Sequence, residues 1–367
     1  MLRGHVTLHR HLFGEITGML GVSYIDISGS PISTPALSFG IRRDTNFALT
    51  RGHNGSNPGQ GRVVTAIKPL VKQFYPQGNL QRSGTPLGTM TLLGFEASFA
   101  SSPRALSETF LQATGAVAGD GEGYADVQAG YRWKTAPDGL RAFAEIAAGF
   151  AGGGDVDTGG GLIASIGAGA AVPVTRGLEL EFGAQATAAL DGDLLAISPY
   201  LRASLTFGDR KRPYADKRDW QLSLGFTHQS ANDAFRNPGV AATASPLLAE
   251  TGLDLFLGDH LYFTGNAQTV VDGDAGGYAV GLFGLGYAMP INDRWTVSLE
   301  GHLGAAGGGG VDTGGGLVGA ARVELDYNLS DTLSISAGLG RLQSLRGGGA
   351  RPVTLHLGFK TRFSTFQ

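Results

Sequence analysis

The residues best placed for chemistry are charged side chains that recur at every second position within otherwise apolar segments. Glu179 and Glu181, for example, alternate with Leu178, Leu180 and Phe182. Successive side chains of a β-strand point to opposite faces, so this spacing gathers the charges on one face. We predict that such faces line a polar interior and contribute these residues: Glu145, Glu179, Glu181, Arg202, Glu300, Arg322, Glu324, Asp326, His356, Lys360 and Arg362.

Two interpretations of this lining stay open. In the first, the charges form a polar path for a hydrophilic solute or an extended polymer. In the second, they pair across strands and only hold the wall together. Both interpretations place the charges away from lipid, where an ionised side chain is costly.

Catalytic and cofactor chemistry find little support in the sequence. The chain has no Cys, which excludes thiol catalysis, thiolate metal sites and disulfides. No G-x-S-x-G motif occurs, and His228, His260 and His302 lack a Ser and an acid at suggestive spacing. The Gly-rich runs are not followed by GK[ST], as a phosphate-binding loop would require. We therefore predict a protein without a cofactor that is not an enzyme.

Acidic residues concentrate at Gly-rich segments, which suggests either Ca²⁺ binding or ordinary turns. Carboxylate and carbonyl oxygens are the ligands that Ca²⁺ prefers, but Asp and Gly are also common turn residues. Ca²⁺ at external loops therefore stays an alternative. A net charge of −3 argues against a nucleic-acid partner, which would need a basic face.

The sequence contains a long internal repeat. The segment GGGDVDTGGGL at 152–162 returns as GGGGVDTGGGL at 307–317. Residues 92–207 align with 247–363, and FALTRGH at 47–53 aligns with WQLSLGF at 220–226. Each unit therefore holds about eight strands. The N-terminal region resembles the tail of an earlier copy with about three strands.

The elements that carry these residues have the pattern of a transmembrane barrel. Apolar residues recur with a period of two over segments of about ten residues, and no apolar run is long enough for a transmembrane helix. Short polar turns alternate with longer Gly/Asp-rich loops, as in outer-membrane barrels. We predict an all-β fold: a transmembrane antiparallel up-and-down β-barrel of about 18–20 strands, built from a repeat of about eight.

The domain organisation follows from the repeat. We assign 1–45 to the tail of a truncated first repeat, 46–210 to a second repeat and 211–367 to a third. One continuous sheet is favoured because almost no linker separates the copies, and a complete protein would then have about 24 strands. Separate eight-stranded barrels in series remain the alternative. A single wide barrel would enclose a lumen too wide for side chains to fill.

The largest departure from the repeat is the segment 54–90. Val63, Ile67, Leu70, Val71 and Phe74 would share one face of a short helix, which Pro69 would weaken. We predict a constriction loop inside the pore; a mobile external loop is the alternative. Its basic residues would be Arg62, Lys68, Lys72 and Arg82.

The strand pattern and the late aromatic residues Phe363 and Phe366 resemble the Gram-negative outer-membrane β-barrel superfamily, although Gln367 follows the last Phe. The resemblance implies a location in the outer membrane, with lipid as a partner. It favours a channel or export pore for hydrophilic solutes or a polymer such as a polysaccharide. A surface-interaction barrel that presents Gly/Asp-rich loops is the alternative, and an outer-membrane lipid-modifying enzyme is a weaker one.

Overall fold

The computed structural model describes residues 2–13, 16–26, 33–43, 47–48, 63–78, 80–100, 104–175, 177–206, 217–232, 234–240 and 245–366. The N-terminal unit of the chain contains an antiparallel sheet in the order β1-β2-β3. Its strands are β1 (Leu2–Phe13), β2 (Ile16–Asp26) and β3 (Ser33–Arg43). β4 (Phe47–Ala48) is a two-residue strand.

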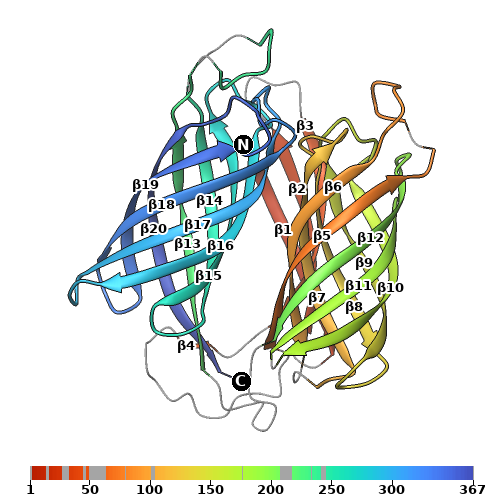
Figure 1. Cartoon of the computed structure of the whole chain (residues 1–367), viewed down its shortest axis with the longest axis horizontal. Helices are drawn as coiled ribbons and strands as arrows, with labels where there is room; N and C mark the ends of the chain where they lie inside the picture. Colours follow the sequence, from red (N-terminus) through yellow and green to blue (C-terminus); the bar gives the residue numbers. More distant parts are fainter. Residues whose placement is uncertain are drawn as a thin grey trace. The chain divides into compact units, whose positions relative to one another are not determined.

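The next eight strands close into a barrel (Figure 1). Each strand pairs antiparallel with its neighbours in the chain, and the last strand, β12, pairs with the first, β5, which closes the sheet. We call this the first barrel. Its strands are β5 (Val63–Pro76), β6 (Met90–Ala100), β7 (Ser107–Gly119), β8 (Ala125–Lys134), β9 (Arg141–Gly152), β10 (Leu162–Thr175), β11 (Leu178–Ala189) and β12 (Leu195–Thr206).

The last eight strands form a second barrel of the same design (Figure 1). Thirteen residue pairs between β13 and β20, from Lys217↔Phe366 to Gln229↔Thr354, close it. Its strands are β13 (Lys217–Gln229), β14 (Leu247–Phe256), β15 (Leu261–Asp272), β16 (Ala279–Pro290), β17 (Trp295–Gly307), β18 (Leu317–Asn328), β19 (Leu333–Ser344) and β20 (Val353–Phe366).

The up-and-down β-barrel architecture and the eight-strand repeat are therefore confirmed, but the favoured continuous sheet is wrong. Each repeat pairs its last strand with its own first strand, as the alternative of barrels in series requires. Closure within a repeat leaves no unpaired strand edge, and it needs no strand from another copy. The interpretation of the N-terminal strands as the tail of an earlier repeat stays a prediction.

The segment 54–90 is not an insertion, because it contains the first strand of the first barrel. β5 holds the place that β13 holds in the second barrel, so the alignment of 47–53 with β13 is wrong. The helix predicted there is also wrong. Lys68, Leu70, Lys72 and Phe74 share a buried inner face, whereas Tyr75 is exposed. Apolar spacing that fits a helix also fits a strand when the inner face mixes Lys with apolar residues.

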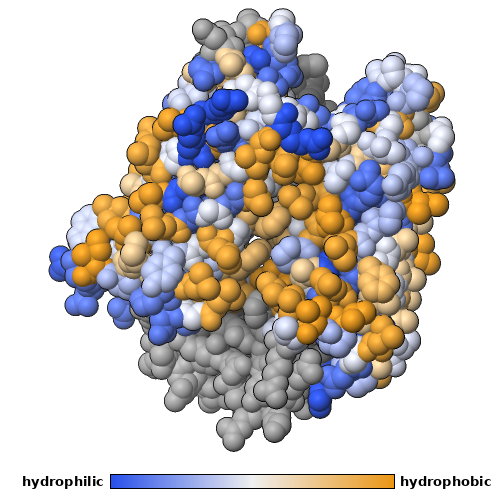
Figure 2. All heavy atoms as spheres, in the orientation of Figure 1, coloured by the Kyte–Doolittle hydropathy of each residue, from blue (hydrophilic) through white to orange (hydrophobic). Residues whose placement is uncertain are grey.

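The two faces of each barrel have inverted polarity. On β11, for example, Phe182 is 50% exposed on the outside, whereas the neighbouring Glu181 is 2% exposed on the inside. Figure 2 shows apolar side chains spread over the outer surfaces of both barrels. In the described part of the chain, no helix has the length and apolar character needed to cross a membrane.

Because each repeat closes its own sheet, residues 217–367 expressed alone should fold into a barrel. We expect β-sheet circular dichroism and heat-modifiable migration on SDS gels after refolding into detergent micelles. A fragment that stops at Asn328 lacks β19 and β20 and should stay unfolded, since its sheet cannot close. Folding of the whole chain but not of 217–367 would contradict two self-contained barrels.

Candidate functional site

The interior of the first barrel is organised around Arg132, a fully buried guanidinium on β8. Its Nη2 lies 2.7 Å from Glu96 Oε2, and its Nε donates to Glu145 Oε2 at 2.8 Å. A third buried carboxylate, that of Glu108, also pairs with it. The strands β6, β7, β8 and β9 are thus joined through one side chain. Such charge-assisted contacts are the strong class of hydrogen bonds.

Two further cations extend this network across the barrel. Lys68 Nζ, on β5, lies 2.8 Å from Glu108 and 2.9 Å from Glu181 on β11. Arg202 Nη2, on β12, lies 2.9 Å from Glu145 Oε1. All these side chains are at most 2% exposed. Together with Arg132, these ion pairs fill the middle of the barrel instead of lining an open path.

The second barrel has a comparable network with a different composition. Arg322, on β18, lies 2.7 Å from Glu250, 2.8 Å from Glu300 and 3.2 Å from Glu324. Lys360 lies 3.1 Å from Asp326. His356 Nδ1 is 3.4 Å from Glu250 Oε2, and His302 Nε2 is 3.6 Å from Glu300 Oε2. Here too, basic side chains and carboxylates pair in the interior of the barrel.

The two networks share one carboxylate position, Glu145 in the first barrel and Glu300 in the second. Each accepts a hydrogen bond from a tyrosine: Tyr200 Oη donates to Glu145 at 3.1 Å, and Tyr262 Oη donates to Glu300 at 2.7 Å. The tyrosines come from β12 and β15, which are not equivalent strands. The repeat in sequence therefore preserves the acceptor but not its donors.

The first copy of the repeated Gly-rich segment forms a lid over one end of the first barrel. Val156 is 1% exposed and forms an antiparallel bridge with Gln81, in the loop after β5. The backbone N–H of Leu194 donates to the carbonyl of Asp157 at 3.0 Å, which ties the lid to the β11–β12 loop. An apolar cluster seals this end: Phe74, Leu87, Met90, Leu92, Ala116, Tyr124, Val156, Leu194 and Ala196.

The second copy builds the same lid on the second barrel. Val311 is 1% exposed and bridges to Arg236 in the β13–β14 loop. Ala350 N–H donates to the Asp312 carbonyl at 2.8 Å, and Gly349 N–H donates to Asp312 Oδ2 at 2.8 Å. The apolar cluster beneath this lid contains Phe235, Leu248, Ala275, Tyr278, Val280, Leu282, Ala306, Val311, Val318, Leu342 and Ala350.

Each lid covers a buried tyrosine and contains glycines in the left-handed conformation. Burial raises the pKa of the Tyr124 and Tyr278 hydroxyls, which stay neutral under the lids. Gly153 and Gly308 both have a φ of 89°, a conformation that glycine adopts readily. A Cβ at either position would collide with the carbonyl of Gly123 or Gly277. The Gly run is thus required by close backbone packing.

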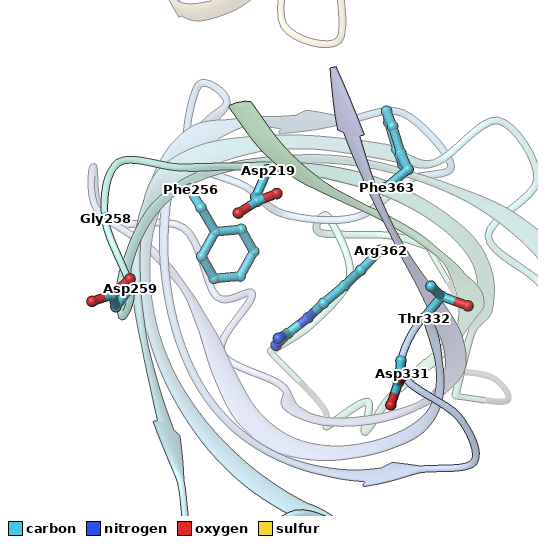
Figure 3. A pocket seen from close by; sticks show the side chains of 8 residues that line it. All are labelled: Asp219, Phe256, Gly258, Asp259, Asp331, Thr332, Arg362 and Phe363. Carbon is cyan, nitrogen blue, oxygen red and sulfur yellow. The ribbon is translucent and has the colours of Figure 1, made fainter. Parts of the chain in front are cut away.

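Small hollows lie at the opposite, turn-bearing ends of the barrels. In the second barrel, a hollow of about 40 Å³ is lined by Asp219, Phe256, Asp331 and Arg362, among others. Figure 3 shows Arg362 reaching from β20 into the ring of strands, near Phe256. A hollow of about 20 Å³ at the turn end of the first barrel is lined by Lys68, Glu108 and Arg141, among others. Such volumes suit a few water molecules.

The structure places the eleven predicted lining residues on the inner faces of the barrels, where most of them are buried. Of the predicted constriction residues, Lys68 and Lys72 point into the first barrel from β5. Arg82 lies in the loop after β5 and donates from Nη2 to the Gly159 carbonyl at 3.1 Å. Arg62 lies outside the described residues. Their role in a pore stays a prediction.

Sequence reasoning missed Glu96, Glu108 and Arg132, which are central to the first network. Arg132 stands between Tyr131 and Trp133, so the period of two could have placed it on the inner face. Tyr200 and Tyr262, large aromatic residues that alternation would equally allow on the outer face, both point inward. Alternation alone does not identify the outer face of a strand when both faces carry large residues.

Acidic residues of the loops accept hydrogen bonds from backbone N–H groups. Gly88 N–H donates to Asp120 Oδ2 at 3.0 Å, and Gly160 N–H donates to Asp191 Oδ1 at 3.0 Å. Across the described part of the chain, no three His, Asp or Glu side chains gather as a metal site would require. Ca²⁺ binding at the loops stays a prediction.

These features define a class of protein. Each barrel is a closed sheet of eight antiparallel strands, apolar outside and charged inside. Short turns lie at one end and longer loops at the other. This is the architecture of transmembrane β-barrels of the bacterial outer membrane. Closure satisfies the backbone hydrogen bonds, which is what allows strands to cross lipid.

Comparisons with known proteins find similar chains only among solved structures of low identity. No protein-family model and no curated protein matches the chain. The solved structure of the outer membrane protein Ail of Yersinia pestis matches 39% of this chain and 98% of its own, at 18% identity and a TM-score of 0.26. The match to the outer membrane channel DcaP of Acinetobacter baumannii covers 98% of this chain and 84% of that one, at 10% identity and a TM-score of 0.23. The match to BamA of Haemophilus ducreyi covers 94% of this chain and 75% of that one, at 9% identity and a TM-score of 0.28.

Removal of the shared carboxylate should destabilise each barrel strongly. Glu145→Ala and Glu300→Ala each take one carboxylate from a buried network and leave its guanidinium groups with an excess of positive charge, at an expected cost of about 3–5 kcal/mol in the free energy of unfolding. Tyr262→Phe should cost about 1 kcal/mol. Arg104→Ala, which breaks an exposed pair with Asp138, is the control and should cost less than about 1 kcal/mol. Urea unfolding in micelles measures all four, and equal losses for Glu145→Ala and Arg104→Ala would contradict the network.

Loss of the lid carboxylate should loosen the second lid without opening the sheet. Asp312→Ala removes the acceptor of Gly349 N–H, so local opening should become about tenfold more frequent. Trypsin should then cut faster after Arg346, while the heat-modifiable migration stays unchanged. Asp274→Ala, at an exposed loop position, is the control. Unchanged cleavage of the Asp312 variant would show that this carboxylate does not hold the lid.

Proposed function

We propose that the chain is an outer-membrane protein of a Gram-negative bacterium whose two barrels are sealed anchors and whose activity lies at its loop ends. This is the surface-interaction alternative of the sequence analysis. The observation that carries it is the filled interior: buried ion pairs occupy the middle of each barrel, and an apolar lid covers one end. An eight-stranded barrel is just wide enough for side chains to fill.

A membrane location is supported by the outer faces of the barrels. Large apolar side chains such as Phe150, Ile166 and Leu357 are 63–65% exposed there. Near the turn ends, Tyr131 and Trp133 lie with ring centroids 4.7 Å apart, and Trp295 and Tyr327 lie 4.8 Å apart. Tyr and Trp favour the membrane–water interface. Water would make this exposed apolar surface unfavourable, whereas lipid would cover it.

The proposal that the activity lies at the loops is supported by the hydrogen bonds that hold the loops in a fixed conformation. Hydrogen bonds join different hairpins at the loop end: Arg82 N–H donates to the Asp155 carbonyl at 2.9 Å, and Asn237 N–H donates to the Gly310 carbonyl at 2.9 Å. A surface that is already ordered loses little conformational entropy when a partner binds. The loops are thus suited to present a fixed shape to a partner outside the cell.

A channel for hydrophilic solutes is the second candidate. It is favoured by charges of both signs inside each barrel and by the water-sized hollows at the turn ends. Conduction would require the central ion pairs to separate and the lid to move. Export of a polysaccharide has less support, because the wide lumen on which that prediction rested is replaced by two narrow barrels. A lipid-modifying enzyme is not supported, because no catalytic group is assembled among the described residues.

Single-channel recording in planar bilayers separates the two candidates. Sealed anchors should give no steady conductance, and Glu145→Ala should remain closed because the lid still covers the barrel. Stable openings of the wild-type chain at moderate voltage would refute the proposal and favour the channel. Insertion is checked in the same preparation by protection of the strands, but not of the loops, from protease.

A further inference from the structure

Arg341 breaks the pattern of the outer surface. Among the strand side chains that the structure describes in the two barrels, it is the only charged one that faces outward, apart from Asp272 at the end of β15. It lies on β19, flanked on the same face by Leu339 and Gln343. A charge on the lipid face is costly at mid-membrane and tolerated near the interface. A ligand of opposite charge would therefore stabilise this side chain on the outer surface.

A second arginine joins Arg341 on this surface. Arg341 pairs with Val353 across the β19–β20 hairpin. Backbone bonds from Leu342 N–H to Pro352 and from Ser344 N–H to Ala350 continue the ladder, so Gln343 lies opposite Arg351. Arg341 and Arg351 are thus diagonal neighbours on one face, a separation that long side chains can span. Gln343 provides an amide between them.

These side chains have no partner within the described part of the chain. Arg341, Gln343 and Arg351 are exposed, and the described residues offer no ion pair or side-chain hydrogen bond to them. The neighbouring positions on β18 are small: Gly319 pairs with Gln343, and Ala321 pairs with Arg341. The donors therefore stand beside small β18 residues, with the Leu345 side chain against Gly319, and the exposed side chains can be reached from the membrane.

The first barrel provides an internal comparison. The register places Ala186, Ala188 and Leu195 at the positions of Arg341, Gln343 and Arg351. The same hairpin is therefore apolar in one copy and carries two guanidinium groups in the other. The equivalent loop of the first barrel contains Asp191 and Asp193, which would repel an anion. The difference is confined to one hairpin of an otherwise similar architecture.

We propose that Arg341, Gln343 and Arg351 bind the phosphate group of a lipid in the membrane leaflet at the loop end of the second barrel. Arg341 lies three residues, about 10 Å of strand, from the end of β19, so its side chain reaches toward the headgroup layer. Guanidinium groups bind phosphate oxygens in bidentate fashion, and the amide of Gln343 adds a neutral donor. The proposal rests on the membrane location proposed above.

Lipid retention tests the site on the full chain. The protein is reconstituted in phosphatidylcholine vesicles that contain a diphosphorylated lipid A, released with mild detergent, and analysed by native mass spectrometry. We expect one retained phosphorylated lipid per chain. Arg341→Ala and Arg351→Ala should each reduce retention about fivefold, and the double variant about 25-fold. Heat-modifiable migration verifies that each variant is folded, and Arg341→Lys/Arg351→Lys should retain an intermediate amount.

The first barrel supplies the matched controls. Leu195→Ala should leave retention unchanged, and Ala186→Arg/Ala188→Gln/Leu195→Arg should add a second retained lipid. Equal retention by the wild type and the folded double variant would overturn the site, as would displacement by excess inorganic phosphate, which would indicate a soluble ligand. Failure of the wild type to insert would instead refute the membrane location, so the two proposals fail separately.

Discussion

The pairing of buried carboxylates with guanidinium and ammonium groups inside each barrel is the constraint on which the rest of the structure depends. Eight strands leave an interior that side chains can fill, so the inward charges must satisfy one another. In the first barrel, Arg132 joins the four consecutive strands β6, β7, β8 and β9. Removal of one partner leaves an unpaired buried charge, which costs more than an exposed pair contributes. Closure and ion pairing therefore support each other.

The two copies have preserved their lids more closely than their interiors. Val156 and Val311 have the same burial, the same bridge to the first loop and the same carbonyl contact at the next residue. The lid depends on backbone conformation and close approach, which few residues other than Gly permit. The interior depends only on charge balance and volume, so donors can move between strands as long as Glu145 or Glu300 keeps its partners.

The outer surface follows a different rule. In the membrane location proposed above, lipid would require only apolar character of this surface. The β19–β20 hairpin is an exception, because it carries Arg341 and Arg351 where the first barrel has Ala186 and Leu195. The repeat thus yields two barrels of one design that differ in the surface of a single hairpin.

The sequence by itself determined the strand type, the eight-strand repeat and the polarity of the two faces. These follow from local rules: alternation of Glu179 and Glu181 with apolar neighbours fixes which face is inward. Only the tertiary structure decided which strand closes each sheet, because the pairing of β5 with β12 leaves no signal in either strand alone. It also decided that Lys68 and Lys72 belong to a strand, and that the repeated Gly-rich segment is a lid. Each of these depends on contacts between segments that are distant in sequence, which periodicity cannot reveal.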